Sequence, residues 1–568
     1  MKAEGIPLEF DRLFLDALNP EELRRLQLSL GTKASPGWLK LLQDCLLDLN
    51  TGASRHKPNL SIEENLALPM ATYFARKFLA AHREGINQLM TRSVWRSLER
   101  SLRSRLASTA RFAAQWAWQV FCGTPGLRAL ACSDSTTTRL ARIYFKEGIE
   151  KRTIFLLCAN PALARLWAVQ AELWLKATGD FLQHAEEFAV GWKQKQRFRI
   201  TAIAPDQSDL HRGNRSVIHV RLNDGSEWYY KPRSGNAELL WAVVLKAAGP
   251  FVRRRFHKPQ LIAGDGHCWM ESVSHKPCRN SREAREFFFK AGVILSLLHR
   301  LRGVDFHADN LIAHGSQPVL TDCEALLHPP VDPLLRSIRG TGFLPMFDQV
   351  NGAGDSLSAL SRITFGPHAV MVGKRRVYAS DFCDAIVAGF EMPGASSRGR
   401  RSITSALSTI VQETEFRFSR HLFRSTAEYN AILDGSLRPG VLRSSSARRS
   451  YLKRLCRKGG HNSFQIEAEV AALEQNDIPI FHGTPAPIRR LNQNQLKQEV
   501  RELGRACRHL SKRVRLNAHT YPGPSLSCSY APLGRVRKPG APPNVLYRLG
   551  QTGRQWKGCF IRRHKQSY

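Results

Sequence analysis

Acidic residues are scarce in this sequence of 568 residues. It contains 84 Lys and Arg but only 48 Asp and Glu, which gives a formal net charge of +36. An excess of this size suggests polyanionic partners at first sight, either nucleic acid or an anionic membrane surface. The excess is spread along the chain rather than gathered into a stripe, and no DNA- or RNA-binding motif accompanies it. We therefore expect no nucleic-acid partner.

Paired cysteines and long apolar runs are also missing. The twelve Cys are scattered singly with no Cys-x-x-Cys pair, so neither a zinc ribbon nor a disulfide framework is indicated. No window of 18 apolar residues predicts a transmembrane helix. The opening residues, Met1 to Glu4, lead into a polar and charged segment rather than a signal peptide. We expect no membrane segment and a reducing, cytoplasmic compartment.

The end of the chain lacks acidic residues altogether. From Leu503 to Tyr568 there is no Asp or Glu, but there are fourteen Lys and Arg, with Pro and Gly clustered at 522–534 and 538–544. This composition cannot bury a good core and predicts a basic, disordered tail. An out-of-frame translation of a disrupted gene would give the same pattern, and the sequence does not separate the two explanations.

What the chain does contain is a short interval with a familiar spacing. Asp305 and Asn310 are five residues apart, which is the step between the base and the metal-binding Asn of a protein-kinase catalytic loop. Two apolar runs, 311–313 and 318–320, follow with a turn between them. They predict two short strands that carry Asp322 and its neighbour Glu324 back beside Asn310.

These residue types suit phosphoryl transfer. Mg²⁺ prefers a few hard oxygen ligands together with phosphate oxygens. We interpret Asp305 as the group that takes the hydroxyl proton, Asn310 and Asp322 as metal ligands, and Glu324 as a further candidate ligand. Asp, His and Asn are also common in solvated loops, so this interval alone leaves a loop without chemistry as an alternative.

The residues upstream strengthen the kinase interpretation. Residues 281–302 have apolar side chains at helical spacing and predict a buried helix with Ser281 as its N-cap. Residues 260–273 and 216–234 each predict a hairpin that turns on a Gly-containing loop. Residues 235–248 predict a helix after the second of these hairpins.

Two features of the upstream hairpin can reach phosphates. Lys231 ends its second strand, as the lysine of the third kinase strand does. The loop before the hairpin contains His211, Arg212 and Gly213, and it could cover phosphates although it is neither a Walker A motif nor a G-x-G-x-x-G loop. Taken alone, His211 would be a capping or solvated residue and Arg212 a surface charge.

The order of these features predicts an α+β chain. We expect a kinase-like bilobal fold, with a small β-rich N-lobe and a helical C-lobe, over residues 196–502. Residues 1–195 form an expected all-helical N-terminal region, and 503–568 form the tail. Within the helical region, apolar residues recur at helical steps and are expected in its core: Trp95, Leu98, Leu102, Leu106, Phe112, Trp116 and Val120.

The same residues carry a family resemblance that runs in order from about residue 200 to about 485. The chain resembles the dehydratase domain of class II lanthipeptide synthetases. The motifs that carry the resemblance are D-x-H-R-G-x-x-x-V at 209–217, Y-K-P-R at 230–233, G-x-D-x-H-x-x-N-L-I-A at 303–313, P-V-L-x-D-x-E at 318–324, R-G-T-G-F-L-P at 339–345, R-x-x-x-R-x-T-x-x-Y at 420–429, and E-x-E…D-I-P-x-F at 467–481.

The resemblance implies a two-step chemistry. Family members transfer the γ-phosphoryl group of ATP, with Mg²⁺, to Ser and Thr of a ribosomal precursor peptide that has a leader. They then expel the phosphate and leave dehydroalanine or dehydrobutyrine. The phosphorylation positions of the family fall on Lys231, Asp305, His307, Asn310 and Asp322, and the upstream loop pair of the family falls on Asp209 and His211, which we count as candidate catalytic residues. The elimination positions fall on Arg420 and Thr426, and no residue is assigned as the base for the α-proton.

The chain also departs from the family. Complete class II enzymes carry a C-terminal cyclase with a Cys, Cys, His zinc site, and we find no such pattern after about residue 485. We therefore expect no zinc, a separate cyclase protein as a partner, and a bacterial cytoplasmic location. Two alternatives remain: a kinase-fold phosphotransferase without elimination, and an inactive truncated remnant that binds a precursor peptide.

Overall fold

The computed structural model describes residues 9–19, 22, 36–52, 54–124, 134–191, 198–329, 336–345, 358–362, 369–394, 397–414, 416, 419–421, 423–459, 462–518, 546–547 and 560–561. The chain divides into two compact units. Unit 1 comprises Met1–Ser226, Arg424–Pro479 and Leu526–Tyr568, and unit 2 comprises Glu227–Phe423 and Ile480–Ser525. This division differs from the boundaries that we expected at residues 195 and 502, because the chain returns to unit 1 after its passage through unit 2.

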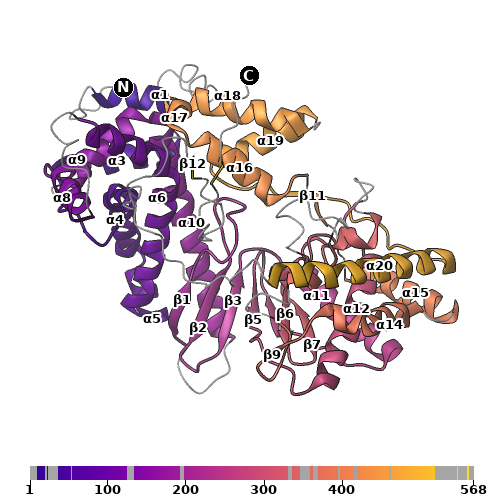
Figure 1. Cartoon of the computed structure of the whole chain (residues 1–568). Coiled ribbons are helices and arrows are strands. Elements are labelled where there is room, and N and C mark those ends of the chain that lie inside the picture. Colours follow the sequence, from indigo (N-terminus) through magenta and orange to yellow (C-terminus); the bar gives the residue numbers. More distant parts are fainter. Residues whose placement is uncertain are drawn as a thin grey trace, which may run out of the picture. The chain divides into compact units, whose positions relative to one another are not determined.

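The N-terminal part of unit 1 is helical in its described residues, as expected (Figure 1). Its helices are α1 (Glu9–Ala17), α3 (Gly37–Thr51), α4 (Ile62–Ala81), α5 (Arg83–Leu89), α6 (Arg92–Cys122), α8 (Asp134–Tyr144), α9 (Ile149–Ala159) and α10 (Pro161–Val190). A capping box between Ser61 and Glu64 starts α4, and Pro161 occupies the first turn of α10. No single described helix is long and apolar enough to cross a membrane, although the bent pair α9 and α10 passes by length and composition.

The expected apolar stripe of α6 is buried only along its first half. Trp95, Leu98, Leu102 and Leu106 lie in the core, but Trp116 is 50% exposed and Val120 is 55% exposed. The expectation of core positions for these last two residues was wrong. Helical spacing shows that residues share a face, but it does not show how far the neighbouring helices extend along that face.

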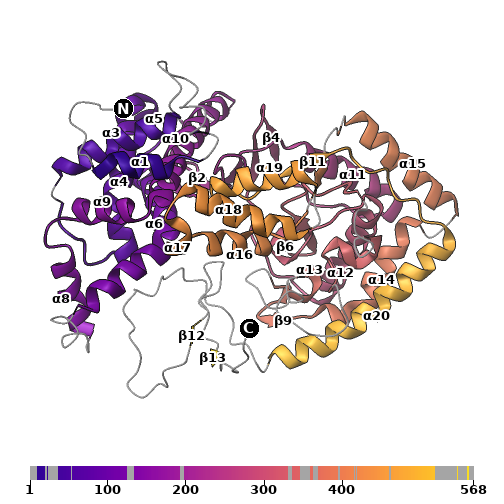
Figure 2. The same cartoon turned by 90° about the horizontal axis from the view of Figure 1, so that it is seen from above.

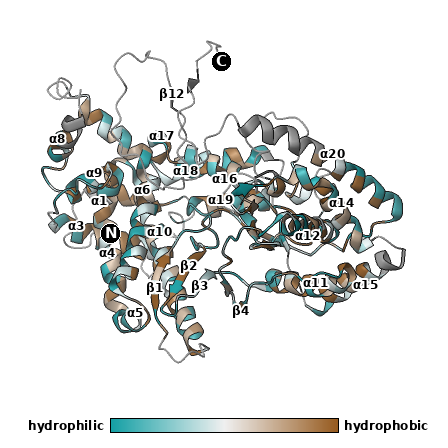
Figure 3. Cartoon of the chain, turned by 60° about the horizontal axis from the view of Figure 1, so that its bottom comes forward, coloured by the Kyte–Doolittle hydropathy of each residue, from teal (hydrophilic) through white to brown (hydrophobic). Residues whose placement is uncertain are grey.

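The remainder of unit 1 contains a strand pair and a second helical group. The strands β1 (Ile200–Ala204) and β2 (Ile218–Leu222) are antiparallel, and Figure 3 shows their hydrophobic residues in brown. The helices α16 (Thr426–Ser436), α18 (Ser445–Cys456) and α19 (Ser463–Glu474) lie side by side (Figure 2) and share a small core around Leu452 and Val470. The short elements are α17 (Pro439–Leu442), β12 (Leu546–Tyr547) and β13 (Phe560–Ile561).

Unit 2 contains the strands on which the site is built. Antiparallel pairing joins β3 (Glu227–Lys231) to β5 (Cys268–Glu271), and β5 to β4 (Leu261–Ala263). A separate hairpin pairs β6 (Leu311–His314) with β7 (Gln317–Leu320). The remaining described strands are β8 (Met371–Val372), β9 (Arg375–Arg376), β10 (Ser419–His421) and β11 (Phe481–Gly483). The strands expected on either side of 264–266 and 314–316 are therefore confirmed.

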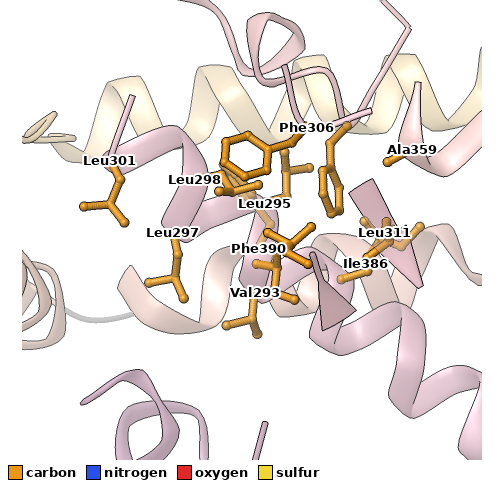
Figure 4. Close-up of a cluster of buried hydrophobic side chains, with 14 of the residues drawn as sticks. Val293, Leu295, Leu297, Leu298, Leu301, Phe306, Leu311, Ala359, Ile386 and Phe390 are labelled. Atoms are coloured by element: carbon orange, nitrogen blue, oxygen red, sulfur yellow. The ribbon is translucent and has the colours of Figure 1, made fainter. Parts of the chain in front are cut away.

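The helices of unit 2 surround one large apolar core. They are α11 (Asn236–Val252), α12 (Ser281–Arg300), α13 (Ala359–Arg362), α14 (Cys383–Glu391), α15 (Ser397–Glu413) and α20 (Gln493–Ala518). At the core, α12 packs on α14 (Figure 4). The approach is close enough to require glycine on both helices. A Cβ on Gly292 would lie 2.0 Å from the carbonyl oxygen of Ile386, and one on Gly389 would lie 1.9 Å from that of Phe289.

Two details of these helices correct the sequence expectations. The N-cap of α12 is Asn280 rather than Ser281, since the Asn280 side chain accepts a hydrogen bond from the amide of Glu283. The boundary expected after residue 502 falls inside α20, which continues to Ala518. Leu503, Ala506 and Cys507 are buried in the core of unit 2. Most of the expected disordered tail lies outside the described residues.

Candidate active site

The β6–β7 hairpin brings the two ends of the 310–322 interval together in unit 2. Leu311 pairs with Leu320, and the amide of Thr321 donates to the carbonyl oxygen of Asn310 at 3.0 Å. Asn310 ends a single 3₁₀ turn, Ala308–Asn310, immediately before β6. Asn310 and Asp322 therefore leave the same end of the hairpin, as the spacing predicted.

Asp305 is fixed in an unusual backbone conformation beside this end. Its φ of 66° lies in the left-handed region, which few residues other than glycine adopt. The side-chain amide of Asn310 donates to the carbonyl oxygen of Asp305 at 3.0 Å. The next residue, Phe306, donates its amide to the carbonyl oxygen of Thr341, in the Arg-Gly-Thr-Gly segment. Two separate hydrogen bonds thus hold the peptide group between Asp305 and Phe306. Backbone strain such as the positive φ of Asp305 often marks a functional residue.

The surroundings of Asp305 favour a basic carboxylate. Neighbouring protein atoms desolvate the Asp305 carboxyl group although part of the side chain stays exposed, which raises the pKa of Asp305 above its ordinary value, and the carboxylates of Asp322 and Glu324 add to the effect. The positive charges of His307 and Arg420 oppose the rise without cancelling it. Nε2 of His307 lies 3.9 Å from the Asp305 carboxylate, whose side chain remains 44% exposed. A carboxylate with a raised pKa that solvent still reaches is suited to accept a proton.

Lys231 ends β3 and forms a buried ion pair. Its Nζ lies 3.0 Å from the carboxylate of Glu238, which belongs to the first turn of α11. Lys231 also donates to the carbonyl oxygen of Thr321, next to Asp322. Burial alone would lower the pKa of Lys231, but Glu238 raises it above its ordinary value. The lysine is therefore charged and held toward the end of the β6–β7 hairpin.

Arg233 connects the carboxylates of this site, and sequence reasoning did not identify it. Its guanidinium lies 2.6 Å from Glu238, 2.8 Å from Asp322 and 3.4 Å from Glu324. Burial would raise the pKa of Glu238, but the charges of Arg233 and Lys231 hold it well below its usual range. Arg233 is the last residue of the Y-K-P-R motif, and Glu238 follows on the next helix, so the motif contained a signal that we had not used.

Arg420 reaches the same group of carboxylates from β10. That strand pairs with β11, and the Arg420 guanidinium forms an ion pair with Glu324. Its side chain is only 10% exposed. Arg420 also contributes to the electrostatics of Asp305. The expected elimination residue therefore lies in the unit that contains Lys231 and the β6–β7 hairpin.

The carboxylates expected to hold metal are partly occupied by arginines. Glu324 is paired with both Arg420 and Arg233, and its expected role as a metal ligand stays a prediction. Arg233 uses only one carboxylate oxygen of Asp322, the oxygen that also accepts from the amide of Glu324. Asn310 donates with its amide nitrogen, which leaves its side-chain oxygen as an acceptor. Asn310 and Asp322 keep the hard oxygen donors that suit Mg²⁺.

The expected loop pair belongs to unit 1, where the loop is fixed by the D-I-P segment. Nδ1 of His211 lies 2.8 Å from the carbonyl oxygen of Ile478. The Asp477 carboxylate accepts from the amide of Gly213 at 2.8 Å. Arg212 and Gly213 both have positive φ, at 52° and 84°. The loop is thus a defined turn held by Asp477, a residue that the sequence reasoning quoted but did not select.

Two more residues of unit 1, Asp209 and Thr426, complete the expected set. Asp209 is exposed in the same loop. Thr426 is the first residue of α16, after the N-cap Ser425. Arg424, two residues earlier, is paired with the fully buried carboxylate of Glu469 at 2.8 Å. The expected site residues are therefore divided between the two units, with Asp209, His211, Arg212, Gly213 and Thr426 in unit 1.

Comparison with known proteins identifies the family of this chain. The family described as "Domain of unknown function (DUF4135)" matches residues 160–364 and 360–484. The lacticin 481/lactococcin biosynthesis protein LcnDR2 of Lactococcus lactis subsp. lactis is 24% identical over an alignment of 332 residues, and the match covers 49% of this chain. The chain spans 35% of the length of that relative. The match to the family covers more than half of the chain, which therefore belongs to DUF4135, the domain family of LanM-type lanthipeptide synthetases.

Proposed function

We propose that the chain is the dehydratase component of a lanthipeptide biosynthesis system. In this proposal it phosphorylates Ser and Thr of a ribosomal precursor peptide with ATP and then eliminates the phosphate. The relative with a role in lacticin 481 biosynthesis supports the pathway. The observation that carries the chemistry is the buried pair of Lys231 and Glu238 next to the hairpin that bears Asn310 and Asp322.

This pair supports a kinase-like unit. In protein kinases a lysine on the third strand pairs with a glutamate on the following helix, and the active state requires that pair. Here Lys231 on β3 and Glu238 on α11 have the same order and contact. The catalytic-loop spacing from Asp305 to Asn310 and the position of Asp322 after two short strands agree with the same scheme. We infer a kinase-like bilobal arrangement from these local relations.

Phosphoryl transfer follows from the placement of the charges. The hydroxyl oxygen of the peptide Ser or Thr forms a bond to the γ-phosphorus of ATP, and the bond from that phosphorus to ADP breaks. Asp305 accepts the proton that the hydroxyl group loses. Lys231 binds the nucleotide phosphates. Asn310 and Asp322 would hold Mg²⁺, which supplies neutralising charge to the phosphate oxygens when bound.

Elimination requires a cation for the leaving phosphate. The α-carbon loses a proton, the electron pair forms the α,β double bond, and the C–O bond to phosphate breaks. Arg420 suits the leaving group because its planar fork offers two donors to phosphate oxygens. Its ion pair with Glu324 keeps the guanidinium oriented before the phosphopeptide forms. Thr426 is proposed for the same step, and Asp209, His211 and His307 for phosphorylation, by their positions in the family motifs.

The remaining assignments belong to the same proposal. The precursor peptide with its leader is the substrate, a separate cyclase protein would close the rings, and the bacterial cytoplasm would supply ATP and Mg²⁺. No zinc is expected in this chain. The second candidate is a kinase-fold phosphotransferase without elimination. In that candidate the Arg420 guanidinium serves only as the ion-pair partner of Glu324 and binds no phosphate.

Mass spectrometry of a precursor peptide co-expressed with this protein tests the proposal. Loss of one water mass per site supports the dehydratase, because phosphorylation and elimination together remove water. Gain of one phosphate mass supports the kinase without elimination. The Lys231→Met variant is the inactive control and should leave the peptide unmodified. An unmodified peptide from soluble, folded wild-type protein would contradict both candidates.

A further inference from the structure

A hollow in unit 2 is lined by four arginines. It has a volume of about 370 Å³ and is bordered by residues that follow α12, that precede the 3₁₀ helix Ile338–Thr341, that follow β11, and that form the first turns of α20. The lining residues are Arg302, Arg336, Arg489, Arg490, Leu491, Gln495, Gln498 and Glu499. None of these is a residue of the candidate active site, and the hollow has no role in the proposed reaction.

The single carboxylate in the lining is already engaged. One oxygen of Glu499 lies 3.2 Å from Nε2 of His299, and the other accepts from the amide of Ile338. Burial alone would raise the pKa of Glu499, but its hydrogen bond and charge interaction with His299 hold it below its ordinary value. Glu499 is therefore ionised, and its two carboxylate oxygens are already bound to His299 and to the amide of Ile338.

The arginines retain a surplus of positive charge. Burial lowers the pKa of Arg302 and Arg489, and the repulsion of neighbouring guanidinium groups lowers it further. Arg489 is positioned by a bond to the carbonyl oxygen of Arg336, and Arg302 by one to that of Pro487 at 2.7 Å. Among the residues that the structure describes, Nε of Arg489 has no hydrogen-bond partner. Two of the arginines are thus rigidly held next to one another without a matching number of carboxylates.

The N-terminus of α20 adds partial positive charge to the hollow. Asn492 and Gln495 exchange hydrogen bonds at 2.9 and 3.0 Å, as in a capping box. The amide end of a helix carries a partial positive charge that favours anions. Because Gln495 and Gln498 lie in the lining, this end of the helix and the arginines face the same space.

We infer that this arginine hollow is a binding site for a small polyvalent oxyanion of the phosphate class. Guanidinium groups bind phosphate oxygens with two parallel donors, and four of them around one space fit a group with several oxygens. The volume admits a diphosphate-sized group together with water. The inference does not depend on the proposed function, since it uses neither the nucleotide site nor the peptide chemistry.

Inorganic pyrophosphate is the probe, titrated without Mg²⁺ into the full-length protein and followed by calorimetry and by the midpoint of thermal unfolding. Arg490→Gln should weaken binding roughly tenfold, since one charged hydrogen-bonding group is lost. Arg490 is exposed, and this substitution should leave the fold intact. The double variant Arg336→Gln, Arg490→Gln should lose binding. The matched control Arg282→Gln removes one exposed arginine at the start of α12 and should bind as the wild type does.

Two further arms separate this site from the others. Lys231→Met should retain pyrophosphate binding, so loss of binding in this variant with retention in the double arginine variant would overturn the inference and leave the nucleotide site as the binder. Equal binding by wild type and double variant would also overturn it. A pentaglutamate peptide that binds where pyrophosphate does not would overturn the phosphate class in favour of an acidic peptide.

Discussion

Arg233 is the residue on which most of the candidate site depends. It contacts Glu238, Asp322 and Glu324, and Lys231 shares the first of these carboxylates. Charges at such short range in a buried setting must be paired, because an unpaired buried ion is strongly destabilising. The three carboxylates are thereby held within reach of the residues expected to perform the chemistry.

Asp322→Ala should abolish phosphorylation of the precursor peptide. The loss of this carboxylate removes a metal ligand and one partner of Arg233. Mass spectrometry of the co-expressed peptide should then show neither phosphorylated nor dehydrated residues. The exposed Asp265 in the β4–β5 turn provides a control, and Asp265→Ala should retain full activity. Undiminished phosphoryl transfer by Asp322→Ala would contradict the kinase-like assignment.

Arg420→Ala should accumulate phosphorylated peptide. Removal of a donor that stabilises developing charge typically costs on the order of 10²–10³ in rate, and here the affected step is elimination rather than transfer. Glu324 keeps its contact with Arg233, so the variant should remain folded. Thr426→Ala should behave similarly. Arg420→Lys keeps the charge but loses the fork, and it should eliminate at an intermediate rate.

Wholly unmodified peptide from a folded Arg420→Ala variant would place Arg420 in substrate or nucleotide binding instead. Circular dichroism and the midpoint of thermal unfolding separate that result from simple misfolding.

Asp305→Asn should stabilise the protein near neutral pH. The folded-state pKa of Asp305 is raised above its unfolded value, so ionisation is harder in the folded protein. Stability therefore falls as pH rises from the unfolded pKa through the raised one, and the Asn side chain escapes this loss. Thermal unfolding measured upward from the ordinary pKa of an aspartate, about 3.9, should show a gap between variant and wild type that widens until the pH has passed the raised pKa.

The exposed Asp309 gives the control, because Asp309→Asn should show no comparable widening. A wild type that is more stable than Asp305→Asn at neutral pH would mean that the attraction of His307 and Arg420 outweighs the burial of Asp305. Activity should be lost in Asp305→Asn at every pH, since the proton acceptor is gone.

At the scale of elements, α20 is the helix that most alters the sequence-based picture. Its N-terminal half contributes Leu496, Leu503, Ala506 and Cys507 to the core of unit 2. Glu502 also pairs with the buried Arg339 of the Arg-Gly-Thr-Gly segment. The helix is therefore part of the unit that holds the candidate site, although its composition alone gave little sign of it.

Truncation after Ala518 should leave the midpoint of thermal unfolding of unit 2 nearly unchanged. Truncation after Glu502 should lower it markedly, because removal of a buried leucine alone typically costs about 2–5 kcal/mol. Differential scanning calorimetry on both truncated proteins makes the comparison. Equal midpoints for the two proteins would show that the buried residues Leu503, Ala506 and Cys507 contribute little to the stability of unit 2.

At the scale of the whole molecule, the chain spans 35% of the length of its relative in lacticin 481 biosynthesis. The proposed dehydratase chemistry needs ATP, Mg²⁺ and a precursor peptide, but it needs no zinc. Ring closure between dehydrated residues and cysteine thiols is a separate reaction in this proposal.

Peptide modified by this chain should therefore carry dehydrated residues and free thiols. Thiol alkylation followed by mass spectrometry should label every cysteine of the product. Purified protein should hold no stoichiometric zinc when its metal content is measured. Thioether rings in the product, or one tightly bound Zn²⁺ per chain, would reveal a site that the sequence reasoning missed.

Much of the local structure was predictable from the sequence. The strands around 264–266 and 314–316 follow from turn residues between apolar runs, and α12 follows from its apolar period. The neighbourhood of Asn310 and Asp322 was predictable for the same reason, because one short hairpin joins them. Turn chemistry and periodicity act over a few residues, and a single sequence displays them directly.

The tertiary structure alone decided the partners of the charged residues and the extent of burial. Arg233 meets Asp322 across 89 positions of sequence, and Arg420 meets Glu324 across 96. The ion pairs of Glu324 with two arginines were therefore not predictable from its position after the β6–β7 hairpin. Trp116 lies exposed on a stripe whose first half is core, and Leu503 lies buried in a stretch that reads as tail. Long-range packing determines both pairing and burial, and no local pattern encodes it.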